Sequence, residues 1–101
     1  MAPLRHRFSS RLWRWDGPAA WYFVSLPHDV SDDIADAVEG RTGGFGSVRV
    51  DVVVGSSQWS TSLFPDSREG TYLLPVKKAV RRAESLDEGA DVDVSLTVAH
   101  P

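Results

Sequence analysis

The sequence contains no cysteine. This absence excludes disulfide bonds, zinc sites built from thiolate ligands and thiol nucleophiles, and it is compatible with a reducing compartment. Long apolar runs are also missing, because no stretch approaches the roughly 20 apolar residues that a membrane-spanning helix needs. The basic N-terminus "MAPLRHRFSS" lacks the apolar segment of a signal peptide. We therefore expect a cytoplasmic protein that does not associate with membranes.

Positive charge is scarce in this chain. Its 11 Lys and Arg residues are outnumbered by 14 Asp and Glu residues, which gives a formal net charge of −3. Neutralising a phosphate backbone usually requires a clear basic surplus, so sequence-specific binding to nucleic acid is not expected. The basic residues are nevertheless unevenly distributed, because the only two lysines, Lys77 and Lys78, stand together in "LPVKKAVRRA".

Motifs of metal sites and active sites are also missing. The three histidines form no HxH or HExxH pattern, so we expect no metal and no cofactor. His28 could contact Asp29, but a histidine at this kind of position is more often an exposed loop or helix-start residue. The hydroxyls of residues 60–62 have no histidine nearby in the sequence and no nucleophile-elbow pattern around them. The Gly-rich stretch 43–47 precedes a strand rather than a helix, which favours a turn over a phosphate-binding loop.

The order of apolar and polar residues predicts a mainly β protein with two short helices. In "SVRVDVVVG" and "VDVSLTV" apolar residues alternate with polar ones, the period of a strand with one buried face. A chain of this length suits one domain, which we place at residues 1–101. The predicted strands cover residues 7–15, 21–26, 47–55, 57–64, 71–74 and 92–98, and the predicted helices cover residues 31–40 and 75–85.

Local signals set the expected helix starts. Ser31 is a plausible N-cap residue for the first helix, because its hydroxyl can accept a backbone N–H of the first turn. Pro75 suits the first position of the second helix, where its missing N–H costs little. Val76 and Val80 begin an apolar stripe of helical period in that second helix.

The chain also shows an internal repeat. Each half contains two strands, a Leu-Pro step, a helix, a Gly-containing turn and an alternating strand. The Leu-Pro steps are Leu26-Pro27 and Leu74-Pro75. The halves cover about residues 7–54 and 57–98, and each reads as a ββαβ unit. We expect the two halves to close into one compact barrel that the helices cap.

The segments "WYFVSLP", "WSTSLFP" and "YLLPVKKAVRRAESLDEGADVDVSL" resemble an uncharacterised prokaryotic family. It is a domain-of-unknown-function family of small proteins, and its members also occur fused to a domain linked by name to bacteriocin protection. The resemblance extends from about Phe8 to Val98, and it implies a double-split β-barrel. It implies no activity, so it assigns no catalytic residue.

That fold is similar to the one of AbrB-type regulators and MazE-type antidotes, which carry a pattern like "IP…R…L…GD.V.V". One departure is Ala90, which separates Gly89 from Asp91 where that pattern has Gly-Asp adjacent. In those regulators two chains each supply half of the barrel. The internal repeat places both halves in this one chain, so we expect a monomer. The matching positions here are Leu74, Pro75, Arg81, Leu86, Gly89, Val92 and Val94.

Basic residues near one tryptophan form the candidate binding surface. Exposed tryptophans often anchor interfaces, and Trp59 is one of several aromatic residues that a small core does not easily accommodate. The expected partner is an unknown protein or a small anionic ligand. The alternative is that nearby acidic residues balance the basic helix internally, as surface pairs worth about 0–1 kcal/mol each. The candidate surface consists of Arg49, Trp59, Ser62, Lys77, Lys78 and Arg81.

Three functions follow from these observations. The first is a binding or interaction module without enzymatic activity. The second is a DNA-binding regulator or antidote of the AbrB or MazE type, against which the net charge and the two halves in one chain both argue. The third is a small-molecule-binding or catalytic accessory domain, which would require a pocket that combines aromatic residues and hydroxyls with Arg or Lys.

Overall fold

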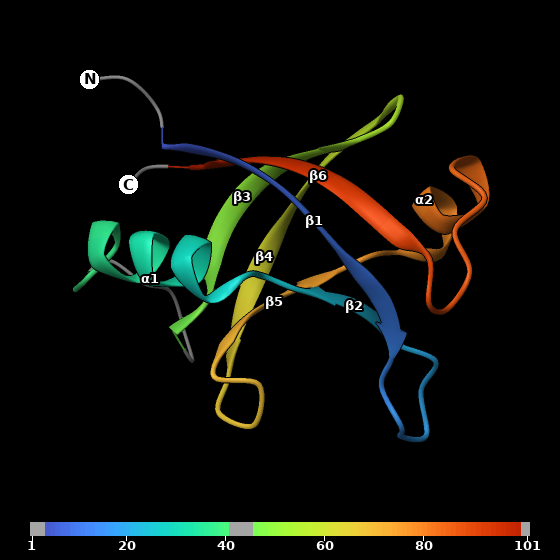
Figure 1. Ribbon diagram of the computed structural model, residues 1–101, viewed down its shortest axis with the longest axis horizontal. Coiled ribbons are helices and arrows are strands. Elements are labelled where there is room, and N and C mark those ends of the chain that lie inside the picture. The colour runs from blue at the N-terminus through green and yellow to red at the C-terminus, as the bar shows by residue number, and fades with distance from the viewer. Residues whose placement is uncertain (1–3, 41–45, 100–101) are drawn as a thin grey trace.

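The computed structural model describes residues 4–40 and 46–99, in which six antiparallel strands form a closed barrel with two short helices (Figure 1). Around the barrel the strands follow the order β1-β2-β5-β4-β3-β6. The prediction of a mainly β barrel with two short helices is therefore confirmed. The elements are β1 (Arg5–Arg14), β2 (Tyr22–Ser25), α1 (His28–Ala37), β3 (Val48–Val54), β4 (Ser57–Asp66), β5 (Thr71–Pro75), α2 (Lys78–Ala83) and β6 (Asp91–Val98).

Two long strands connect two sheets. Both β1 and β4 contain ten residues, and each changes its partner along its length. The first part of β1 pairs with β6 and its last part with β2, while the first part of β4 pairs with β3 and its last part with β5. We call β6, β3 and the first parts of β1 and β4 sheet A. Sheet B consists of β2, β5 and the last parts of the same two long strands.

Alternating side chains fill the barrel. In β3, Val48, Val50, Val52 and Val54 are buried while Arg49 is exposed, because successive side chains of a strand point to opposite faces. β6 follows the same alternation. Each fully buried Val or Leu stabilises the fold by roughly 1.5–3 kcal/mol relative to an exposed one. The opposite parity of β3 and β6 faces outward, whereas β5 is buried on both parities. The outward residues form the surfaces on which a site can lie.

The first helix begins earlier than predicted. α1 starts at His28 with Pro27 at the N-cap position, and it ends at Ala37. The prediction of Ser31 as the N-cap was wrong, because Ser31 lies inside the helix and is buried. Its hydroxyl accepts the backbone N–H of Tyr72 at 3.0 Å. This hydrogen bond attaches the helix to β5, a long-range contact that the local sequence does not reveal.

The second helix is shorter than the predicted 75–85. Pro75 does not open it, so that prediction was wrong. Instead, Pro75 is the last residue of β5 and pairs with Phe23 of β2. The following N–H, from Val76, donates to the Tyr22 carbonyl at 2.9 Å and extends the pairing by one more bond. Because the pairing with β2 continues to Val76, the helix begins only at Lys78.

The two helices lie at opposite ends of the barrel (Figure 1). All six predicted strands are present, with ends within two residues of the predicted ones. Most of the Gly-rich stretch 43–47 lies outside the described residues, so its predicted turn is not addressed by the structure. No helix in residues 4–40 or 46–99 is long and apolar enough to cross a membrane.

Candidate functional site

The outer face of sheet A carries a polar groove of about 650 Å³. Four strands contribute to it, and their outward residues align in rows across the sheet. One row contains Arg5, Thr97, Asp51 and Ser60, which are consecutive cross-strand partners on β1, β6, β3 and β4. The next row contains Arg7, Ser95 and Gln58 among its members. Strand register therefore brings arginines and hydroxyls from distant segments into one surface, which we call the sheet A groove.

The charges of the sheet A groove are unevenly matched. Arg5 and Arg7 lie two residues apart on β1, so both point outward, and both are exposed. Asp51, the carboxylate of the groove, accepts a hydrogen bond from the Ser60 hydroxyl. Within the described part of the chain the one ion pair is Arg11–Asp91 at 3.9 Å, outside this groove. Two guanidinium groups therefore face solvent beside hydroxyl donors, an arrangement suited to a carboxylate or phosphate ligand.

The predicted site residues Arg49 and Ser62 lie at the edge of this groove. They are direct cross-strand partners on β3 and β4. Their pair neighbours the Asp51–Ser60 pair, and it shares the outward parity of that pair. The structure thus brings these two predicted residues together, one row beyond the row of Arg5 and outside the lining of the groove. The sequence prediction did not include Arg5 and Arg7, and the predicted strand 7–15 began after Arg5, whereas in β1 both arginines lie on one face.

Trp59 has a different environment from its predicted neighbours. It pairs with the buried Val52, so its side chain has the inward parity of β4. It is half-buried and packs against the aliphatic core, and it also contributes to the wall of the sheet A groove. Trp59 therefore connects the core to the groove.

The other predicted basic residues, on or next to α2, do not line the sheet A groove. Arg81 is half-buried, and its Nε donates to the Val76 carbonyl at 3.2 Å. Its guanidinium carbon lies 3.8 Å from the centre of the Tyr22 ring, a cation–π contact that holds α2 against β2. Lys77 and Lys78 are exposed at the start of the helix.

Glu84, an acidic residue at the end of α2, stabilises the turn between β3 and β4. Glu84 follows the helix, and its carboxylate accepts hydrogen bonds from Ser56 at 3.2 Å and from Ser57 at 2.7 Å. The turn residue Gly55 has a φ of +58°, and a Cβ there would lie 1.9 Å from a Glu84 carboxylate oxygen. Across residues 4–40 and 46–99, no basic side chain of α2 forms an ion pair. The described structure therefore contains no ion pairs that neutralise the basic side chains of α2.

A second groove of about 640 Å³ lies on the outer face of sheet B, and its floor is aromatic. Trp13 and Trp15, which the sequence places on one parity, both line it. Trp21 is 50% exposed, Phe64 42% and Trp15 39%. We call this surface the aromatic groove. The sequence alone does not reveal this surface, because β4 is connected to β1 here only across β5 and β2 of the folded sheet.

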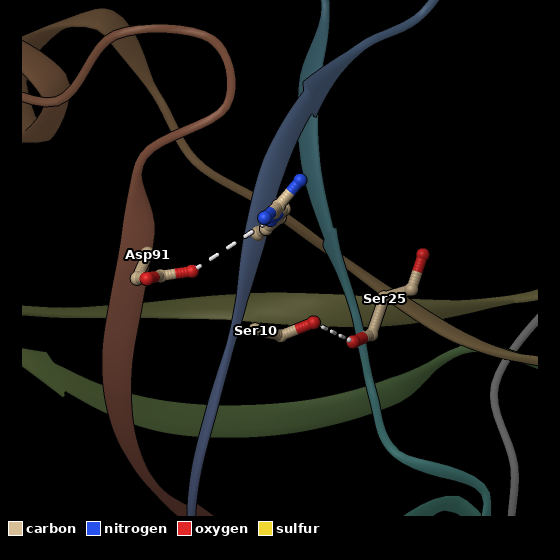
Figure 2. Close-up of polar contacts among 4 residues, drawn as sticks. Ser10, Ser25 and Asp91 are labelled. Atoms are coloured by element: carbon tan, nitrogen blue, oxygen red, sulfur yellow. Dashed lines mark hydrogen bonds and ion pairs between the residues drawn. The ribbon is translucent and has the colours of Figure 1, made fainter.

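The aromatic groove is held by ring contacts and hydrogen bonds. Phe23 lies between two indoles, with ring centres 5.3 Å from Trp13 and 6.0 Å from Trp21. Nε1 of Trp13 donates to the Ser25 hydroxyl at 2.9 Å, and that hydroxyl donates to Glu69 at 3.0 Å. Figure 2 shows Ser10 bonding to the carbonyl of Ser25 from β1, while the Ser25 hydroxyl points away from it. The indole of Trp13 is thus fixed in one orientation.

Comparison with known proteins places the chain in a family. The family model described as a domain of unknown function, DUF1905, matches residues 8–96. The chain belongs to the DUF1905 family. This result confirms the resemblance to an uncharacterised domain family. A search of curated proteins finds no match for the chain.

The DUF1905 domain also contains titratable groups away from both grooves. Burial raises the pKa of Tyr72, which lies in β5, from its ordinary value of 10.0. Nε2 of His6 is buried and has no hydrogen-bond partner within the described structure. Among residues 4–40 and 46–99, no cluster of three or more His, Cys, Asp or Glu side chains could hold a metal ion. Neither Tyr72 nor His6 lines either groove of this DUF1905 domain.

Proposed function

We propose that this domain is a non-enzymatic binding module and that the sheet A groove binds a small anionic ligand. One observation carries the proposal. Arg5 and Arg7 present two guanidinium groups on one face, beside Ser95 and Thr97, without an ion-pair partner among the described residues. Arginine is suited to such a role because its planar fork matches the geometry of carboxylate and phosphate oxygens.

The neighbouring side chains support an anion rather than a cation. The serine and threonine hydroxyls of β6 can donate to ligand oxygens, and hydrogen bonds to charged groups contribute about 1.5–3 kcal/mol each. Asp51 opposes an anion, but the two arginines that line the groove outnumber this one carboxylate. Arg49 and Ser62 extend the same surface by one row. Lys77 and Lys78 have no part in this site, since they lie outside the groove.

A titration with inorganic pyrophosphate tests the proposal. We expect saturable binding that the Arg7→Ala variant weakens about tenfold or more, equivalent to about 1.4 kcal/mol. Arg11→Ala is the matched control, because Arg11 is an exposed, outward arginine of the same strand that lies outside the groove. Calorimetry measures both affinities at constant ionic strength. Equal weakening by the two substitutions would reveal non-specific charge attraction and contradict the proposal.

We further propose that the barrel is a double-split β-barrel in which two ββαβ halves, about 7–54 and 57–98, are related by a pseudo-two-fold axis. The element order β1-β2-α1-β3 followed by β4-β5-α2-β6 supports this interpretation. Exchanging the halves turns the β1–β2 pairing into β4–β5, and it turns β1–β6 into β4–β3. The β2–β5 and β3–β6 pairings map onto themselves. A chain that contains both halves of an AbrB-like barrel needs no second copy, so we propose a monomeric single domain.

A further inference from the structure

The aromatic groove has the character of a docking surface for another molecule. Three of its aromatic side chains, Trp15, Trp21 and Phe64, remain exposed in the folded chain. Charged residues surround this apolar floor. Exposed apolar patches with a polar rim mark interaction sites, and tryptophans are the residues that most often dominate binding energy there. The groove shares no lining residue with the sheet A groove, so it represents a separate site.

We propose that the aromatic groove binds a proline-rich segment of a partner protein in the polyproline II conformation, with a Lys or Arg next to the prolines. Aromatic-lined grooves recognise such segments because pyrrolidine rings pack between aromatic side chains. The polyproline II helix is extended in the unbound state, so little conformational entropy is lost on binding. Three features of the groove support this occupant.

The closed barrel provides the first argument. Strand order returns from β6 to β1, and the one-sided ends of β1 and β4 beside the groove are only three residues long each. Such short edges offer a peptide little backbone pairing, so a bound segment has to be recognised mainly through side chains. A polyproline II segment fits this condition, because it makes no backbone ladder of its own and needs none from its partner.

The rigidity of the rings provides the second argument. Phe23 is held between Trp13 and Trp21, and the indole of Trp13 is hydrogen-bonded to Ser25. The ring of Trp15 covers Gly17, where a Cβ would lie only 2.1 Å from it. Ring positions fixed before binding reduce the entropy that a ligand has to offset. The stacked rings of Trp21 and Phe23, whose planes differ by 10°, form a ridge against which prolines can pack.

The polar rim provides the third argument. Its acidic residues outnumber its basic ones, with Asp16, Asp66 and Glu69 against Arg14 and Arg68. This excess favours a cationic side chain next to the prolines, which the open ring faces can also attract. The two rim arginines can donate to the backbone carbonyls that a polyproline II segment leaves unpaired. The rim therefore complements both the backbone and the charge of the proposed segment.

A synthetic peptide of repeated Pro-Pro-Leu units that ends in an Arg-Arg pair serves as the probe. We expect it to bind saturably and to change the tryptophan fluorescence. Trp21→Ala and Phe64→Ala should each weaken binding about tenfold, since exposed aromatic anchors carry much of the energy of such contacts. Val53→Ala is the control, because Val53 is an exposed apolar residue of sheet A outside the aromatic groove. Thermal unfolding of each variant verifies that the fold is retained.

Four results would overturn the proposal. The first is equal binding of a peptide in which alanines replace the prolines, which would indicate recognition of positive charge alone. The second is binding to anionic lipid vesicles that the peptide does not displace. The third is a concentration-dependent dimer that Phe64→Ala abolishes, which would assign the groove to a second copy of the chain. The fourth is the absence of saturable peptide binding to the intact domain. None of these results bears on the sheet A groove.

Discussion

At the scale of single residues, the face of the sheet on which an aromatic side chain lies determines whether it packs against the core or is exposed. Trp59 pairs with a buried valine and packs against the core, whereas Trp21 is half-exposed on the outer face of sheet B. The sequence could not separate them, because "SQWSTSLF" has polar residues on both parities. Arg49 and Ser62 are cross-strand partners, and their relation to Arg5 depends on the register between β3 and β6.

Substitution of Trp59 tests this difference in environment. Trp59→Ala should lower the free energy of unfolding by about 2–4 kcal/mol, somewhat less than for a fully buried tryptophan. Trp21→Ala should change it by less than about 1 kcal/mol, as exposed positions usually do. Urea denaturation followed by circular dichroism measures both. Similar stabilities of the two variants would show that Trp59 does not act as a core residue.

The raised pKa of Tyr72 predicts how the free energy of unfolding changes at alkaline pH. Because burial raises the pKa of its phenol in the folded state, the folded protein holds this proton more tightly than the unfolded chain does. Its contribution to stability is therefore complete below the unfolded value of 10.0, and it is lost as the pH rises through the folded value. Urea denaturation across this pH range should show a decline that Tyr72→Phe makes shallower. An identical decline in the variant would contradict this assignment.

At the scale of elements, the strands were predictable and the helix starts were not. Alternating valines define β3 and β6 regardless of their neighbours. Ser31 and Pro75 carry typical capping signals, but each is used by tertiary structure: Ser31 bonds to β5, and Pro75 pairs with β2. Local capping energies of about 1 kcal/mol are easily exceeded by such long-range contacts.

The Ser31 contact yields a test at this scale. Ser31→Ala leaves the buried N–H of Tyr72 without its acceptor, so the free energy of unfolding should fall by about 1–3 kcal/mol. Ser9→Ala, an exposed serine in β1, should have an effect near zero. Hydrogen exchange at Tyr72 should also become faster in the Ser31 variant relative to global unfolding. Unchanged stability would mean that the hydrogen bond does not hold α1 to β5.

At the scale of the whole molecule, the barrel separates two chemically different faces. Sheet A presents arginines and hydroxyls, whereas sheet B presents aromatic rings with charged residues around them. The sequence predicted a barrel from its alternating strands and Leu-Pro steps. It could not predict the faces, because each of them combines residues from strands that are far apart along the chain, such as β1 and β4. The basic and acidic helices lie at opposite ends, so neither neutralises the other (Figure 1).

The most direct test of the proposed binding function is an NMR titration of the labelled domain with inorganic pyrophosphate. We predict saturable shifts of the backbone amides of Arg5, Arg7, Ser95 and Thr97, with no comparable shifts around Trp21. Arg7→Ala should move the midpoint of these shifts to about tenfold or more higher pyrophosphate concentration, whereas Arg11→Ala should leave it in place. Shifts concentrated at Lys77 and Lys78, or shifts that grow without saturation over the whole surface, would contradict the assignment of the sheet A groove as an anion site.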